Sequence, residues 1–128
     1  MLVRVEKRRG DTLYINDGAY GALFDAAHID WRFPVKLVRA SGARPAAFSF
    51  YGPTCDDLDH MAGPFHLPGD VAPGDYVEVG MLGAYGCAMR TGFNGFGSDL
   101  RVVVDDEPME TLYAAEQERP AASNVVTL

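Results

Sequence analysis

The sequence is poor in cysteine and in long apolar runs, and each scarcity excludes a class of protein. Two cysteines among 128 residues cannot build a disulfide framework, so a reducing, cytoplasmic setting is expected. No apolar run approaches the roughly 20 residues that a membrane-spanning helix needs. The first residues, MLVRVEKRRGD, contain no apolar core of a signal peptide. We therefore expect no membrane association.

Familiar catalytic and metal-binding motifs are also missing. The chain has no CxxC, HExxH, GxSxG or P-loop pattern, and its glycines at positions 92, 95 and 97 do not follow the dinucleotide-binding spacing. The three histidines, at positions 28, 60 and 66, are not spaced as metal ligands on one helix or strand. We therefore expect no metal site.

Positive charge is in short supply. Lysine and arginine number 11 against 18 acidic residues, giving a net charge of −7. This balance argues against nucleic acid or an anionic membrane as the main partner. Much of the excess negative charge lies in residues 105–128, which hold six acidic residues and one basic residue. This composition predicts an irregular acidic tail, disordered or with a short helix near residues 109–117, after a folded domain over residues 1–104.

The body of the chain reads as a series of short strands separated by turns rich in glycine and proline. Apolar and polar residues alternate at positions 2–7, as in a half-buried strand. Residues 20–28 fit either a strand or a helical turn. The pattern predicts an all-β fold, a small barrel or sandwich. Further strands are predicted at residues 12–16, 36–40, 46–51, 76–79, 84–89 and 100–104.

One segment, FYGPTCDDLD at residues 50–59, carries a dense set of reactive side chains. Its Gly-Pro pair ends the preceding strand, and Thr54, Cys55 and three aspartates follow directly. Carboxylates so close together would suit a bound ammonium group, since two charges about 4 Å apart interact by roughly 1 kcal/mol in water and about 4 kcal/mol at an effective dielectric near 20. The alternative is an Asp-rich loop that caps a helix beside a buried, inert Cys55.

The two cysteines are expected to differ. The acidic neighbours of Cys55 disfavour a standing thiolate and are compatible with a neutral thiol that donates a proton. Those same neighbours weaken a further alternative, a hydrolase in which Cys55 works with His60 and an aspartate. Cys87 lies in the apolar stretch AYGCAM and is expected in the core.

Four stretches resemble, in order, ornithine decarboxylase and its relatives, the pyridoxal phosphate (PLP) dependent decarboxylases of the alanine-racemase-like fold group. GPTCDDLD at residues 52–59 is similar to the active-site loop of this family. LYINDGAYG at residues 13–21, GDYVEVGMLGAYG at 74–86 and FNGF at 93–96 are similar to three further family segments. The Cys-Asp form of the loop looks more like decarboxylases of ornithine or lysine than like diaminopimelate decarboxylases.

The resemblance implies that this chain is the C-terminal β-domain of such an enzyme, a small Greek-key-like barrel. The N-terminal TIM barrel, which would supply the Schiff-base lysine and the phosphate-binding loop, is absent. The only lysines, Lys7 and Lys36, fall in ordinary strand contexts. We therefore expect the chain to be inactive alone and not to bind PLP covalently. The complete enzyme would be a cytoplasmic carboxy-lyase of polyamine biosynthesis.

Site residues follow from the resemblance, position by position. Cys55 matches the cysteine that helps to protonate the α-carbon of the substrate after CO2 leaves. Asp56 matches the acid that binds the distal ammonium of a small basic amino acid, and Asp25 matches a second such acid. Asp57 replaces a serine or glycine common in the family and adds a charge beside the site.

Three further residues match the surroundings of the cofactor and substrate. Tyr85 matches the tyrosine whose hydroxyl reaches the PLP phosphate, and Phe93 and Asn94 match residues that line the site. In this family the active sites form across a homodimer, so this chain would offer Cys55 and Asp56 to the PLP of the other subunit. The alternative is a catalytically inert interaction module, because some family members act by binding regulatory partners.

Overall fold

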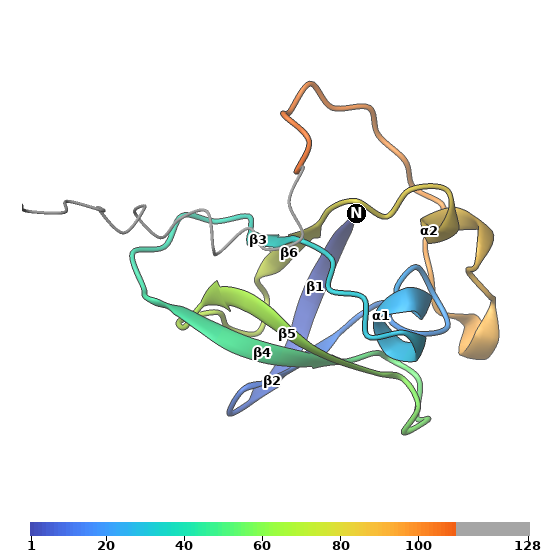
Figure 1. The fold of residues 1–128 in the computed structure, drawn as a ribbon, viewed down its shortest axis with the longest axis horizontal. Helices are drawn as coiled ribbons and strands as arrows, with labels where there is room; N and C mark the ends of the chain where they lie inside the picture. The colour runs from blue at the N-terminus through green and yellow to red at the C-terminus, as the bar shows by residue number, and fades with distance from the viewer. Residues whose placement is uncertain (110–128) are drawn as a thin grey trace, which may run out of the picture.

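The structure is a computed structural model that describes residues 1–109, and its main feature is a six-stranded sheet curled into a nearly closed barrel (Figure 1). The strand order is β3-β6-β1-β2-β4-β5, with β2 and β4 parallel and all other neighbours antiparallel. The edge strands β3 and β5 contact each other. The predicted all-β fold is confirmed. The strands are β1 (Leu2–Arg9), β2 (Thr12–Ile15), β3 (Val35–Leu37), β4 (Pro45–Tyr51), β5 (His60–Pro68) and β6 (Tyr76–Val79).

The core fills the barrel because buried residues alternate along its strands. Val3 and Val5 of β1 are fully buried, and Phe48 and Phe50 repeat the period of two in β4. The ring of Phe50 stacks on that of Phe65 in β5, with 4.3 Å between the centroids. Burying a side chain of this kind contributes about 1.5–3 kcal/mol to stability, so this alternation fixes which face of each strand points inward.

Three short helices lie at one end of the barrel, on the right in Figure 1. They are α1 (Phe24–His28), α2 (Tyr85–Ala88) and the 3₁₀-helix η1 (Phe93–Gly95). Residues 20–28, which fit a strand or a helical turn from sequence, form a turn followed by α1. Within residues 1–109, no helix has the length and apolar character needed to cross a membrane.

Two predicted strands are wrong. The strand predicted at residues 84–89 is replaced by α2 (Tyr85–Ala88), since an apolar run this short does not distinguish helix from strand by its periodicity. Residues 100–104 are rich in valine, yet Val103 is 99% exposed and no strand of residues 1–109 pairs with them. Strand propensity reflects packing on a partner surface, which this segment lacks in the described part of the chain.

The burial of Cys87 is also predicted wrongly. Gly86 is the buried residue of α2, and Cys87 next to it is exposed. A four-residue helix turns only one narrow face towards the barrel, so an apolar stretch on it need not be buried.

The acidic C-terminal region is described only in part. Residues 105–109 form neither helix nor strand. Residues 110–128, with most of the short helix predicted near 109–117, lie outside the described residues. The division into a barrel over residues 1–104 and a tail over residues 105–128 therefore stays a prediction.

Candidate functional site

The loop of residues 52–59 joins β4 to β5 and presents the cysteine and two of its three aspartates outside the barrel. Backbone hydrogen bonds close it, from Gly52 N to Asp59 O at 2.9 Å and from Asp59 N to Asp56 O at 3.0 Å. Cys55 and Asp57 are exposed and Asp56 is half-buried. The burial of Cys55 expected in the alternative interpretation is therefore wrong, and the thiol and two carboxylates are open to a ligand.

Asp59 anchors this loop from inside. It is fully buried, and its Oδ1 accepts a hydrogen bond from the backbone N–H of Ala19 at 2.7 Å. Its Oδ2 accepts bonds from the backbone N–H and the hydroxyl of Thr54, at 3.0 and 2.7 Å. A buried carboxylate without such donors would cost several kcal/mol. Asp59 therefore ties the loop to the turn after β2 and is not available to a ligand.

Gly18 and Gly52 leave the space that the Asp59 carboxylate occupies. A Cβ at Gly18 or at Gly52 would collide with Oδ1 of Asp59. The turn after β2 and the loop after β4 thus approach each other across a gap that only glycine leaves open. This close approach fixes where Asp56 stands relative to the neighbouring turn.

Tyr20 connects Asp56 to a third loop. Its hydroxyl donates a hydrogen bond to Oδ2 of Asp56, and its ring lies against Phe93 with 4.5 Å between the centroids. The backbone N–H and the hydroxyl of Thr91 donate to the carbonyl oxygen of Tyr20, at 2.8 and 2.9 Å. A small pocket between the three loops is lined by residues that include Tyr20, Thr54 and Phe93. Asp56 and Phe93, far apart in sequence, therefore meet at Tyr20.

Hydrogen bonding keeps Asp56 in its charged form. The Tyr20 hydroxyl, and then the backbone N–H of Leu58 at 2.9 Å, lower the pKa of Asp56 below its ordinary value. The same hydrogen bond raises the pKa of Tyr20, because the phenol proton is held by the carboxylate. Asp56 is thus an anion that accepts hydrogen bonds, as a cationic ligand requires.

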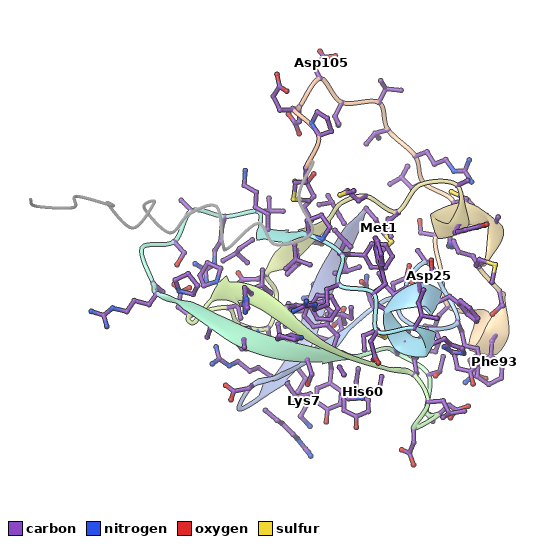
Figure 2. The ribbon with its side chains drawn as sticks, in the orientation of Figure 1. Met1, Lys7, Asp25, His60, Phe93 and Asp105 are labelled. Carbon is purple, nitrogen blue, oxygen red and sulfur yellow. The ribbon has the colours of Figure 1, made fainter. Side chains whose placement is uncertain are left out.

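The other residues matched by resemblance lie on the short helices. Asp25 is on α1, and Figure 2 shows it at the same end of the molecule as Phe93. Tyr85 is on α2 and 65% exposed, and Asn94 is in η1 with a left-handed φ of 56°, which asparagine tolerates better than most residues. Between described residues, no hydrogen bond joins Asp25 or Tyr85 to Asp56.

The described residues include two lysines, the residue type that forms a Schiff base with PLP. Lys7 and Lys36 are exposed on β1 and β3, and Figure 2 shows Lys7 well apart from Asp25 and Phe93. Neither lysine belongs to the loop of residues 52–59. Tyr85 offers a hydroxyl to a phosphate. Within residues 1–109, no group of three or more histidine, cysteine or acidic side chains could hold a metal ion.

Sequence reasoning missed the roles of Tyr20 and Asp59. Tyr20 lies in the LYINDGAYG segment and Asp59 in the GPTCDDLD segment, so the motifs mark both positions without assigning them a partner. Their hydrogen bonds reach 36 and 40 residues along the chain, to Asp56 and Ala19. Only the packing of the loops reveals such pairs.

Comparisons with known proteins identify the family to which this sheet domain belongs. Residues 1–83 match the family model of the C-terminal sheet domain of pyridoxal-dependent decarboxylases. Ornithine decarboxylase of Schizosaccharomyces pombe is 34% identical over 107 residues, which cover 76% of this chain and 24% of that protein. Antizyme inhibitor 2 of Xenopus laevis is 36% identical over 96 residues, which cover 71% of this chain and 20% of that protein.

A solved structure agrees with these relatives. The lysine/ornithine decarboxylase of Vibrio vulnificus, crystallised with cadaverine, superposes with a TM-score of 0.64 at 29% identity, covering 82% of this chain and 29% of that one. The chain thus spans about a quarter of the length of the curated relatives that it matches. On the match of the family model and of the fold, the chain belongs to the pyridoxal-dependent decarboxylases, whose C-terminal sheet domain it represents.

Proposed function

We propose that this chain forms part of a PLP-dependent decarboxylase of small basic amino acids of the ornithine or lysine type. The observation that carries the proposal is the exposed thiol of Cys55 next to the ionised, half-buried carboxylate of Asp56, on a loop that the family model includes. The reaction would belong to polyamine biosynthesis in the cytoplasm.

In this proposal each residue has one task. PLP, when bound, supplies the electron sink that lets the α-carboxylate leave as CO2. Asp56, with Asp25, holds the distal ammonium and so orients the substrate. The thiol of Cys55 then delivers a proton to the α-carbon, for which its exposure is suited.

The surroundings would be completed by residues of the short helices. The Tyr85 hydroxyl binds the cofactor phosphate, and Phe93 and Asn94 line the substrate space. Asp57, exposed beside Asp56, adds negative charge that favours cationic substrates.

The remaining parts of the site would come from other chains or domains. A PLP-binding TIM barrel would supply the lysine and the phosphate loop, and the site would form across a homodimer. Support comes from the exposed apolar side chains of Tyr85, Met89, Phe93 and Phe96 on α2 and around η1, since surfaces of this kind mark interfaces. Alone, the chain would be inactive.

A second candidate is an inert interaction module. One relative is named for inhibition rather than for decarboxylation, the antizyme inhibitor 2 that is 36% identical to this chain. The presence of Cys55, Asp56 and Tyr85 together favours the enzyme, because an interaction module has no need of a proton donor beside an ammonium-binding acid.

A domain exchange separates the two candidates. The sheet domain of the Vibrio vulnificus lysine/ornithine decarboxylase is replaced by this chain, and CO2 release from ornithine and from lysine is measured with PLP. The enzyme hypothesis predicts decarboxylation by the chimaera and none by the chain alone. A chimaera that folds and binds PLP but releases no CO2 favours the interaction module.

A further inference from the structure

We propose that Tyr20 is a positioning residue, which holds the Asp56 carboxylate in the orientation in which it meets the distal ammonium of the substrate. The proposal rests on the function proposed above, because it assigns Asp56 to the substrate. It adds a residue to which the sequence motifs assign no role, and it explains how an acid between the exposed residues Cys55 and Asp57 is kept in one orientation.

The first step is the fixation of the carboxylate from two sides. Tyr20 donates to Oδ2 of Asp56 and the backbone N–H of Leu58 donates to Oδ1. An ionised carboxylate has about four lone-pair sites, so these two bonds leave about two of them free. Asp56 is half-buried, and the free sites are those that an ammonium group can use.

The second step is the fixation of Tyr20 itself. Its carbonyl oxygen accepts both donors of Thr91, and its ring packs on Phe93. Phe93 N–H in turn donates to the Thr91 hydroxyl oxygen at 3.2 Å. A side chain held at its backbone and at its ring has little rotational freedom left, so its hydroxyl can impose one orientation on Asp56.

The third step concerns the charges that face this pair. The charge of Asp59 also raises the pKa of Tyr20, and Asp57 follows Asp56 directly on the same loop. Both are acidic, and neither stabilises a negative Asp56. The Tyr20 hydroxyl therefore contributes most to stabilising the ionised Asp56 carboxylate, and the backbone N–H of Leu58 contributes less.

The test begins with the complete 128-residue chain. Carbon-13 NMR follows the titration of the Asp56 carboxyl in the wild type, in Tyr20→Phe and in the control Tyr14→Phe. Tyr20→Phe keeps the ring on Phe93 and removes only the donor, so the pKa of Asp56 should rise towards its ordinary value. Tyr14, half-buried on β2 against Tyr51, should leave that titration unchanged when it is replaced.

If Tyr20→Phe folds poorly, a variant of the acceptor, Asp56→Asn, tests the same hydrogen bond. Asp56→Asn should lower the pKa of Tyr20, followed by carbon-13 NMR of its ring, because the carboxylate acceptor is gone. If both titrations match the wild type, the proposal is overturned.

The effect of Tyr20 on substrate binding is measured by steady-state kinetics of the chimaera described above. Tyr20→Phe should raise the KM for ornithine about three- to tenfold with kcat changed less than about twofold, since the loss is one hydrogen bond to a charged group. An unchanged KM contradicts the positioning role. A chimaera that is inactive with the wild-type chain contradicts the proposed function, while the titrations still decide whether Tyr20 sets the state of Asp56.

Discussion

At the scale of single residues, the environment divides three neighbouring acids into three tasks. Asp57 is exposed, Asp56 is half-buried and bonded by Tyr20, and Asp59 is fully buried and bonded by Thr54 and Ala19. Burial and donors, more than position in the sequence, decide which acid can meet a ligand. The site loop is therefore part anchor and part binding surface.

The hydrogen bonds of the buried Asp59 predict that replacing this residue lowers stability more than replacing the exposed Asp57. Asp59→Asn keeps the size of the side chain but removes the charge, and it sets an amide N–H₂ against donors of Thr54 or Ala19. We expect the free energy of unfolding to fall by about 2 kcal/mol, measured by urea denaturation. Asp57→Asn on the exposed surface is the control and should leave the urea midpoint in place. Equal midpoints for the two variants would contradict the anchoring role.

Some of these residue roles could be predicted from the sequence, and others could not. The density of acids beside Cys55 already singles out residues 52–59, because the pattern lies within one short segment. The pairing of Tyr20 with Asp56 could not be predicted, since it depends on two loops meeting across 36 residues of chain. The exposure of Cys87 could not be predicted either. The residues around it are apolar, and an apolar segment alone does not show which side of a short helix faces the core.

At the scale of elements, the site depends on the close approach of the turn after β2 to the loop after β4. Gly18 and Gly52 leave the space that the Asp59 carboxylate fills. The parallel pairing of β2 with β4, with Leu13 opposite Phe50, brings these two connections to the same end of the barrel. The register of the sheet thus places the functional loop.

The close approach predicts that one methyl group is enough to disturb the site. Gly52→Ala should lower the free energy of unfolding by about 1–3 kcal/mol, because the added carbon overlaps Asp59 Oδ1. Gly42→Ala is the matched control, since a Cβ there meets no atom within 4 Å. Thermal unfolding followed by circular dichroism measures both. A Gly52→Ala variant as stable as Gly42→Ala would rule out the tight approach.

A second element, the turn before β6, should respond to pH. Arg39 donates to Oδ1 of Asp75 at 2.8 Å, and the backbone N–H of Ala72 donates to its Oδ2 at 2.9 Å. These bonds lower the pKa of Asp75 below its ordinary value of 3.8. A carboxyl whose pKa is lower in the folded state stabilises the fold above its ordinary pKa and loses that contribution as the pH falls through the folded pKa.

The expected outcome is a urea midpoint that falls between pH 6 and pH 2 less steeply in Asp75→Asn than in the wild type. Asp99→Asn, at an exposed position, should keep the wild-type slope. Identical slopes for Asp75→Asn and the wild type would show that the contacts with Arg39 and Ala72 carry no pH dependence.

The strands illustrate what patterns can and cannot specify at this scale. β1 alternates cleanly and is predicted from residues 2–7, whereas β5 is absent from the prediction because Gly63, Pro64 and Pro68 interrupt its pattern. Its place is set by its long antiparallel pairing with β4, which is a tertiary interaction. Residues 100–104 show the opposite case, a strand-like sequence without a strand to pair with in residues 1–109.

At the scale of the whole molecule, the chain represents one domain of the longer proteins that it matches. It spans about a quarter of the length of its relatives, and Lys7 and Lys36 lie on β1 and β3, outside the loop of residues 52–59. Incubation with PLP followed by borohydride reduction should therefore leave no specific adduct on the chain, as measured by mass spectrometry. A stoichiometric adduct on Lys7 or Lys36 would contradict the need for a lysine from elsewhere.

The most direct test is steady-state decarboxylation of ornithine by the chimaera that carries this chain. We expect Cys55→Ala to lower kcat and Asp56→Ala mainly to raise KM, with Gly42→Ala, where an added Cβ meets no atom within 4 Å, as the unchanged control. If Cys55→Ala and Asp56→Ala both turn over ornithine with the wild-type kcat and KM, these side chains do not serve the reaction and the account is contradicted.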